Sequence, residues 1–275
     1  MKTKHSGNWI NTAKGETLRI EANFVGFAFA PHRHDTYTLA LTTTGVQCFN
    51  YRGSLRYSLP GEVVVLHPDE LHDGLAGTVA PFGYRAINID PVDVQNILHG
   101  HDLPFLPNGV TGKSCLVDIA QRFLTEFQRP LEPLEYQDLI YDFATALQKE
   151  TTIHHKHTTA NYQAIQLARE YIDDSLDNEV TLEQLAIITG YSKWQITRDF
   201  RSLFGTSPYR YLTLRRLEKA QSLMSQGIPI AQVAQDCFFS DQSHFTRQFK
   251  KSFGTTPNIW NKLNGNLPTA KKNES

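Results

Sequence analysis

The chain has few cysteines, no long apolar run and almost no net charge, and each shortage argues against a class of protein. Its 275 residues include three cysteines, Cys48, Cys115 and Cys237, an odd number without the paired spacing of a metal site. These argue against a disulfide framework and favour a reducing compartment. No apolar run approaches eighteen residues, and the amino end lacks a signal-peptide core, so we expect a cytoplasmic protein with no membrane partner.

The formal net charge of −1 would by itself argue against a nucleic-acid partner, but the charges are unevenly distributed. From residue 190 onward there are 13 basic and 5 acidic residues, a balance of +8. Residues 1–160 carry 13 basic and 17 acidic residues (−4), and residues 161–189 carry one basic and six acidic residues (−5). The basic side chains therefore gather at the carboxyl end, where a nucleic acid would bind.

That end contains one pattern twice. Residues 191–208 read "YSKWQITRDFRSLFGTSP" and residues 239–257 read "FSDQSHFTRQFKKSFGTTP". Both copies contain Ser, then Thr-Arg-x-Phe, then Phe-Gly-Thr-x-Pro, and they differ by one residue between the Ser and the Arg. An internal repeat predicts one supersecondary unit per copy.

Each copy predicts a helix with one apolar stripe, preceded by a shorter helix in "TLEQLAIITG" or "PIAQVAQDCF". Thr181 and Gln184 form a predicted capping box, and Pro229 suits a first helical turn. The polar outer faces hold the candidate DNA-binding residues Lys193, Trp194, Thr197, Arg198 and Arg201, and then Gln242, Ser243, Arg247 and Lys250. This is the helix-turn-helix pattern. The alternative is a pair of helical hairpins with solvated charged faces.

The segment between the copies predicts a long connecting helix. Ser207 can cap it, Pro208 can take its first position, and Gly227 follows its end. About twenty helical residues span roughly 30 Å. That length is close to the separation of about 34 Å between successive major grooves on one face of B-DNA. The two units could then enter adjacent grooves of double-stranded DNA.

On these motifs, residues 162–260 resemble the DNA-binding domain of AraC/XylS-family transcriptional regulators. The resemblance implies that Trp194, Thr197 and Arg198 face bases in one unit, and that Gln242, Ser243 and Arg247 do so in the other. It assigns Lys250 to a phosphate and implies RNA polymerase as a partner. Phe238 stands where the second unit commonly has glycine, so we expect a less sharp turn there.

The first half of the chain predicts short strands followed by two helices. The strand segments are "TLRIEANFVGFAFA", "YTLALTTTG", "VQCFNYRG", "LRYSL", "EVVVLHP" and "YRAINID", separated by turn signals that include Asp73-Gly74. Apolar stripes predict helices at about 113–128 and 135–150, and a stripe left uncovered would favour a homodimer. Residues 150–161, "ETTIHHKHTTAN", predict a linker; a metal site at its three histidines is the less favoured alternative.

Histidines mark the candidate effector site. His32 and His34 in "PHRHDTY" and His72 in "LHPDELHDG" can converge if alternate strand residues point the same way. The arrangement is similar to the cupin barrel, in which two nearby histidines, a glutamate and a later histidine hold a metal. Thr38 stands where that glutamate would be. Three imidazoles can bind zinc, but without the carboxylate we favour a polar pocket with no metal and no cofactor.

The same region resembles the amino-terminal sensor domain of the AraC family, which implies a small-molecule effector pocket inside the barrel. His32, His34, Tyr37, His72 and Tyr84 are its predicted polar lining, with core packing as the alternative for Tyr84. The predicted fold class is α+β. It comprises a cupin-like β-barrel with two helices (residues 1–150), a linker (151–160), an all-α domain of two helix-turn-helix units joined by a long helix (161–263), and a flexible tail (264–275).

Two functions compete with an effector-responsive, DNA-binding transcription activator. One is a metal-dependent cupin enzyme with an appended DNA-binding domain, which the missing carboxylate argues against. The other is repair of alkylated DNA, which needs an activated thiol, whereas the cysteines stand in "VQCFN", "KSCLV" and "QDCFF" without a basic neighbour. The sequence therefore predicts a regulator that is not an enzyme.

Overall fold

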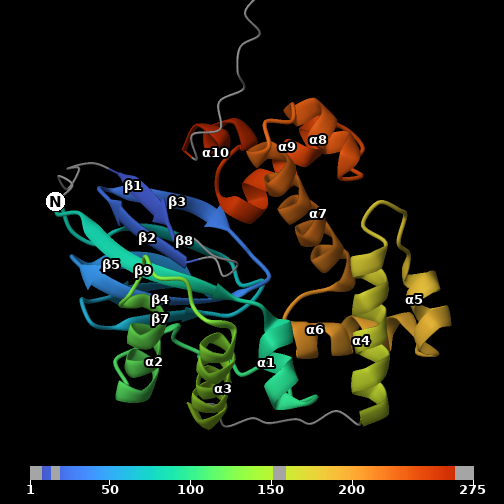
Figure 1. Cartoon of the computed structure of the whole chain (residues 1–275), viewed down its shortest axis with the longest axis horizontal. Helices are drawn as coiled ribbons and strands as arrows, with labels where there is room; N and C mark the ends of the chain where they lie inside the picture. The colour runs from blue at the N-terminus through green and yellow to red at the C-terminus, as the bar shows by residue number, and fades with distance from the viewer. Residues whose placement is uncertain (1–7, 14–18, 151–158, 264–275) are drawn as a thin grey trace, which may run out of the picture.

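The computed structural model describes residues 8–13, 19–150 and 159–263. The predicted tail and most of the predicted linker (residues 151–158) lie outside the described residues. Figure 1 shows strands with three helices in the amino-terminal part and seven helices in the carboxyl-terminal part. Along the described chain, no helix combines the length and apolarity needed to cross a membrane.

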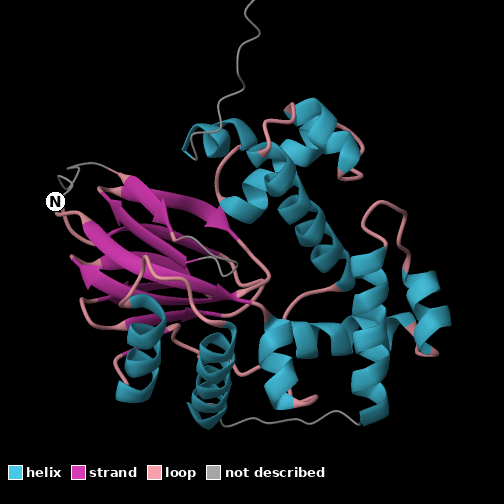
Figure 2. Ribbon diagram, in the orientation of Figure 1, coloured by secondary structure: helices cyan, strands magenta, loops and turns pink. Residues whose placement is uncertain are grey.

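The amino-terminal strands form two antiparallel sheets. The six-stranded sheet has the order β1-β2-β9-β4-β7-β10 and the four-stranded sheet has the order β3-β8-β5-β6. The strands are β1 (Trp9–Thr12), β2 (Arg19–Phe24), β3 (Phe27–His32), β4 (Tyr37–Thr44), β5 (Gln47–Tyr51), β6 (Ser54–Ser58), β7 (Val63–Leu66), β8 (His72–Ala76), β9 (Phe82–Ile89) and β10 (Val110–Thr111). The predicted closed barrel is therefore corrected to two sheets whose described strands do not pair with each other (Figure 2).

Successive side chains of the central strands point to opposite faces of the six-stranded sheet, so the core has two layers. In β7, Val64 and Leu66 face the aromatic layer between the sheets, whereas Val63 and Val65 face the helices outside the six-stranded sheet. The first layer also contains Phe24, Phe49, Tyr51, Phe82 and Tyr84. Strands buried on both faces read as continuous apolar runs such as "VVVL" because both sides are covered.

Three helices complete the amino-terminal part: α1 (Pro91–Leu98), α2 (Ser114–Leu124) and α3 (Pro133–Glu150). The apolar stripes of α2 and α3, including Phe123 and Phe143, are buried in the layer against the six-stranded sheet. The expectation that a stripe is left for a homodimer partner is therefore not met: packing against the sheet, α1 and one another buries both stripes.

Two local expectations were wrong. The segment Asp73-Gly74 is part of strand β8, not a turn, because β8 pairs with both β3 and β5. The sequence analysis also missed α1, although Asp90 caps it through the Val92 amide and Pro91 takes its first position. That pairing of a cap and a proline is a recognised helix-start signal.

The carboxyl-terminal part consists of two small helical units with separate cores. Its helices are α4 (Thr159–Asp174), α5 (Leu182–Thr189), α6 (Lys193–Phe204), α7 (Pro208–Ser225), α8 (Ile230–Asp236), α9 (Gln242–Phe253) and α10 (Pro257–Leu263). Helix α7 joins the units rigidly, because Leu212 packs in the first core and Leu217 packs in the second. Its 18 residues span about 27 Å.

The turn between α8 and α9 is as sharp as the turn between α5 and α6, contrary to our expectation. Phe238 has a φ of 59° and Gly190 has a φ of 72°, so a phenylalanine adopts the left-handed conformation that favours glycine. Its ring is partly exposed and lies under the Arg216 guanidinium, whose carbon is 4.6 Å from the ring centroid. This cation–π contact offsets part of the backbone strain.

Candidate DNA-binding surface and effector site

The first helix-turn-helix unit is built from α5 and α6. Thr181 and Gln184 make the predicted capping box of α5, and Ser192 and Gln195 make another at α6. Ile196, Phe200, Leu203 and Phe204 point into the core. The caps fix where α6 begins, and the apolar stripe fixes its rotation, so its opposite face is presented to solvent.

The second unit repeats this arrangement with a different cap. Asp241, the residue after Ser240, accepts the amide hydrogen of His244 at the start of α9. The one-residue difference between the copies is therefore absorbed at the start of the helix, where Asp241 takes the capping position. Phe245 and Phe249 are fully buried, which sets the same rotation for α9 as for α6.

The predicted DNA-binding side chains lie on the outer faces of α6 and α9. Trp194 is 67% exposed, and Thr197 is half-buried. The other members are exposed: Lys193, Arg198, Arg201, Gln242, Ser243, Arg247 and Lys250. The structure thus brings each predicted set together on one helix.

The two arginines at matching repeat positions have different surroundings. The Arg198 guanidinium lies 4.6 Å from the Trp194 ring centroid and pairs with the buried carboxylate of Asp199. Its pKa is raised, mainly by the hydrogen bond to Asp199. Arg247 forms no ion pair with any residue that the structure describes. Asp199 engages the Nε of Arg198, so a base contact that turns the guanidinium would disturb this internal contact, whereas Arg247 has no ion pair among the described residues to disturb.

The amino-terminal part of the described chain (residues 8–13 and 19–150) is named the sensor part, and α6 and α9, which carry the candidate DNA contacts, are named the reading helices. The sensor part contacts the carboxyl-terminal ends of both reading helices (Figure 1). At α6, the Leu103 amide donates to the Ser202 carbonyl at 3.1 Å, and Ser202 bonds to Asp102. At α9, the Arg33 amide donates to the Lys251 carbonyl at 3.2 Å. The amino-terminal halves of both helices, which carry most of the candidate base contacts, lie away from these contacts.

Arginines of α7 anchor the same interface. Arg215 pairs with Asp35, and its Nη1 lies 3.5 Å from the Asp90 carboxylate. Burial alone would lower the pKa of Arg215, but Asp35, Glu218 and Asp90 outweigh it and raise the pKa. The sequence analysis missed this group, since nothing local marks side chains that pair across about 180 positions.

A second arginine extends the anchor. Arg210 Nε lies 3.3 Å from Asp69 Oδ1, and its Nη2 donates to the Arg33 carbonyl at 3.1 Å. Arg33 lies in the loop that follows β3, and Asp69 lies in the loop that precedes β8. The interface therefore joins the connecting helix to the segments that hold the three histidines.

His32, His34 and His72 converge as predicted. His32 and His72 are directly opposite each other on β3 and β8, and His34 follows β3. Each offers a ring nitrogen within 4.8 Å of the others. Burial, with neighbouring imidazoles, lowers the pKa of His34 to about 4 and that of His72 well below its ordinary value; burial also lowers the pKa of His32. All three are therefore neutral at pH 7.

The two predicted tyrosines lie apart from the histidines. Tyr37 donates its hydroxyl hydrogen to the Pro104 carbonyl at 2.7 Å and packs on Phe143, on the helix-covered side of the six-stranded sheet. Tyr84 stacks with Phe24 and Phe82 in the layer between the sheets, and burial raises its pKa. Packed aromatic side chains occupy the region where the sequence analysis placed an effector pocket.

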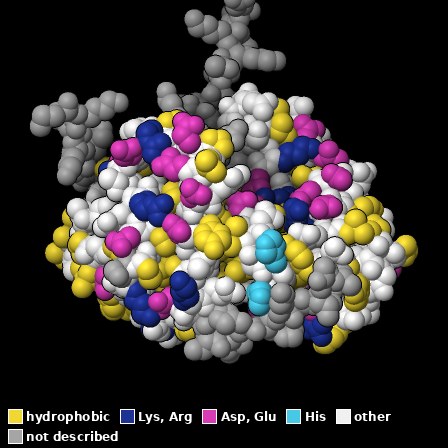
Figure 3. Space-filling model, turned by 60° about the horizontal axis from the view of Figure 1, so that its bottom comes forward, with side chains coloured by type: hydrophobic (Ala, Val, Ile, Leu, Met, Phe, Trp, Pro, Cys, Tyr) yellow, Lys and Arg dark blue, Asp and Glu magenta, His cyan; other side chains and the backbone are white. Residues whose placement is uncertain are grey.

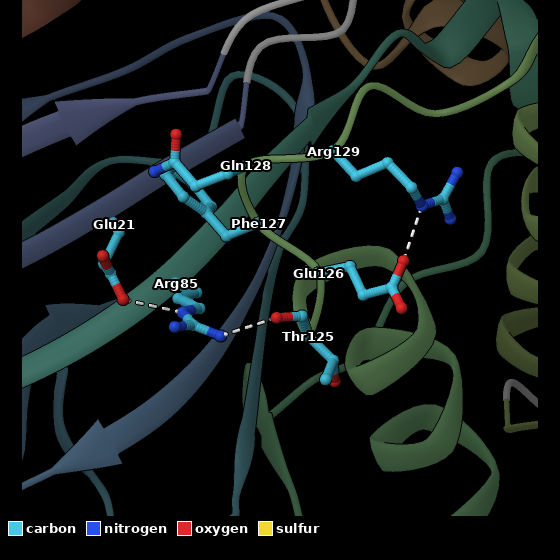
Figure 4. Close-up of a pocket in the computed structure, with 7 residues that line it drawn as sticks. All are labelled: Glu21, Arg85, Thr125, Glu126, Phe127, Gln128 and Arg129. Atoms are coloured by element: carbon cyan, nitrogen blue, oxygen red, sulfur yellow. Dashed lines mark hydrogen bonds and ion pairs between the residues drawn. The ribbon is translucent and has the colours of Figure 1, made fainter.

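Two surface hollows are present in the sensor part. The larger, about 410 Å³, lies between β2, β9 and the end of α2 (Figure 4). Its Arg85 pairs with Glu21 at 2.8 Å and its Arg129 pairs with Glu126 at 2.6 Å, so its charged groups satisfy one another. The smaller, about 220 Å³, is bordered by Arg33, Arg52 and His72, so one member of the histidine cluster lines it.

The charge on one outer face is mixed. Figure 3 turns forward the side that faces downward in Figure 1, where α1, α2 and α3 lie, and shows basic and acidic side chains interspersed. Such a face lacks the one-sign patch that attracts nucleic acid. The reading faces of α6 and α9 are the better candidates.

Comparison with known proteins agrees with this division. Residues 14–144 match the model described as the AraC-like ligand binding domain, and residues 185–262 match the model described as a helix-turn-helix domain. The chain is 26% identical over 245 residues to the uncharacterized HTH-type transcriptional regulator YbfI of Bacillus subtilis, covering 82% of this chain and 86% of that one.

Two further likenesses cover the reading units and the whole fold. The chain is 36% identical over 91 residues to the right origin-binding protein of Escherichia coli K12. The aligned segment covers 33% of this chain and 32% of that protein. The crystal structure of ToxT from Vibrio cholerae O395 superposes with a TM-score of 0.66 at 12% identity, covering 91% of this chain and 98% of that one. The chain belongs to the AraC family, and it is a DNA-binding transcription regulator with a ligand-binding domain.

Proposed function

We propose that the protein is a cytoplasmic, effector-responsive activator whose sensor part controls how its two reading helices meet DNA. The observation that carries this proposal is the contact of one sensor part with the carboxyl-terminal ends of both α6 and α9. A change in the sensor can therefore shift both helices without occupying their reading faces. The HTH-type transcriptional activator AarP of Providencia stuartii, 29% identical over 106 residues, supports the activator assignment.

On DNA, the two units would enter adjacent major grooves. The proposed base contacts are Trp194, Thr197, Arg198, Gln242, Ser243 and Arg247, and the proposed phosphate contacts are Lys193, Arg201 and Lys250. Exposed arginine suits bidentate contact with guanine, and lysine suits a phosphate as a point charge. The span of α7, about 27 Å, leaves the side chains of both units to bridge the remaining distance to a groove spacing of about 34 Å.

The effector would contact His32, His34 and His72 through the hollow bordered by His72. ToxT has been solved with an unsaturated fatty acid bound, so a small molecule can bind to a protein of this fold. Tyr37 and Tyr84 could influence the site only through the packed sheet, because neither lies with the histidines.

We also propose RNA polymerase and a second copy of the chain as partners. A homodimer would use the outer faces of the helices, where Leu134 and Tyr141 are exposed, since the inner stripes are covered. Sedimentation of the full chain with and without effector reads this state directly.

The test of effector response is a thermal-shift screen of the full chain against sugars, amino acids and carboxylic acids, with EDTA present. We expect a compound that raises the Tm of the wild type and fails to raise that of His34→Ala, because a ligand that binds only the native state stabilises it. The same compound should change a reporter's transcription in the wild type alone. DNA binding should be equal in the two proteins.

The control is His99→Asn, which removes an exposed imidazole outside the cluster and suits the left-handed φ of 47° at that position. It should keep both the thermal shift and the transcriptional response. A compound that stabilises wild type and His34→Ala equally, while driving the reporter in both, would place the effector elsewhere.

A further inference from the structure

The tautomers of the three clustered histidines carry an inference beyond an organic effector. His32 Nδ1 lies 2.8 Å from the Ala30 carbonyl oxygen, His34 Nδ1 lies 3.0 Å from the Thr36 carbonyl oxygen, and His72 Nδ1 lies 2.9 Å from the Glu70 carbonyl oxygen. A carbonyl only accepts a hydrogen bond, so each Nδ1 carries the hydrogen. Each Nε2 therefore keeps its lone pair.

Each of the three rings is hydrogen-bonded through Nδ1 to a backbone carbonyl. This is the arrangement found around histidines that bind a metal ion. A metal-binding histidine commonly donates its second ring N–H to a carbonyl, which fixes both the ring orientation and the tautomer. His72 is buried and His34 is half-buried, and an imidazole binds a cation in its neutral form. Tetrahedral zinc with Zn–N bonds of about 2.1 Å needs ligand nitrogens about 3.4 Å apart. One ring nitrogen of each histidine lies within 4.8 Å of the other two, so ion binding requires the rings to draw closer together.

The Thr38 hydroxyl supplies an independent observation. It lies 3.1 Å from His34 Nε2 and 3.0 Å from Asn88 Oδ1, both acceptors in this tautomer, while its single hydrogen can serve one of them. An ion on His34 Nε2 would leave that hydrogen for Asn88. Thr38 then acts as a neighbour that positions groups around the ion, in place of a fourth protein ligand.

We propose that His32, His34 and His72 bind a divalent transition-metal ion of the zinc type through their Nε2 atoms, with one position open to water or an effector atom. This inference rests on the proposed function, because it names the ligand class of the same site. Imidazole ligands suit zinc, copper, iron and nickel. The regulator then responds to the metal itself or to a molecule held by it.

The site is placed to act on the second reading helix. A Cβ at Gly254, immediately after α9, would lie 3.3 Å from His32 Nδ1 and 3.3 Å from the Ala30 carbonyl oxygen. The backbone amide of Arg33, next to His32, donates a hydrogen bond to the Lys251 carbonyl near the end of α9. Drawing His32 toward an ion therefore moves the segment on which α9 rests.

Cobalt(II) is the probe that tests the site, because its visible absorption reports tetrahedral coordination directly. The protein carries His154→Asn, His155→Asn and His157→Asn, which removes the competing histidines of residues 150–161. We expect one equivalent of Co²⁺ with the intense absorption of tetrahedral nitrogen ligation, displaced by Zn²⁺. His72→Gln and His34→Gln should each lose that spectrum and weaken binding at least 10-fold, whereas His99→Asn should keep both.

Circular dichroism shows which variants are folded, and two independent ligand variants keep the test decisive if one of them misfolds. A wild-type protein without tetrahedral absorption, or a spectrum retained in a folded His34→Gln or His72→Gln variant, overturns the metal site. The EDTA-treated thermal-shift screen reads the proposed function separately: an organic ligand that depends on His34 in EDTA supports the effector response, and the Co²⁺ spectrum alone decides the metal site.

Discussion

Replacing Arg247 by alanine is expected to weaken binding to the protein's preferred DNA sequence about 10- to 100-fold, and to relax selectivity at one base pair. Arg247 is exposed on the outer face of α9 and has no ion-pair partner among the described residues. Its guanidinium is free to make two hydrogen bonds to one guanine. Fluorescence anisotropy on selected and scrambled duplexes at fixed salt measures the change.

Arg198→Ala should cost less than Arg247→Ala, although the repeat makes the two positions equivalent. We expect Arg198 to weaken its contacts with Asp199 and Trp194 when it turns to a base, so its net gain on binding should be smaller. Lys250→Ala is the control for a phosphate contact: it should weaken selected and scrambled DNA alike and lower the salt dependence. Equal losses on both duplexes for Arg247→Ala would remove it from base recognition.

Replacing Arg215 by alanine is expected to lower the free energy of unfolding by about 3–5 kcal/mol, because it leaves the buried Asp35 carboxylate without its cation. Asp35 is 4% exposed and Asp90 lies 3.5 Å from the same guanidinium. Urea unfolding followed by circular dichroism gives the value. The surface pair of Arg122 with Asp142 is the matched control, and Arg122→Ala should cost less than about 1 kcal/mol.

A double-mutant cycle with Asp35→Asn isolates the contact. If Arg215 acts mainly through Asp35, the double variant should be more stable than the sum of the single effects predicts. Additive losses would show that the two side chains stabilise the protein independently. The interface between the sensor part and α7 would then need another source of stability.

The reading units were predictable because their signals are local. The capping box of α5, the apolar stripes of α6 and α9 and the glycine after each of these two helices are all local patterns, and the structure has each of them. The outer-face residues follow from helix geometry once the buried stripe is known. Phe238 shows the limit, because a cation–π contact with Arg216 helps it keep the sharp turn.

Features that depend on distant partners were not predictable. Asp73-Gly74 has turn composition, yet pairing with two neighbouring strands makes it part of β8. Tyr37 and Tyr84 lie on β4 and β9 and point into packed layers on opposite faces of the six-stranded sheet, whereas His32 and His72 lie on strands of the other sheet. The pairing of Arg215 with Asp35 and the histidine tautomers appear only when the chain is folded.

Footprinting with hydroxyl radicals on DNA selected by the full chain is the most direct test of a regulator that reads two adjacent grooves. We predict two protected stretches on one face of the duplex, separated by about one helical turn of 10–10.5 base pairs. Arg198→Ala should weaken one stretch and Arg247→Ala the other. A single protected stretch in the wild type, weakened by Arg247→Ala and unchanged by Arg198→Ala, would contradict the account.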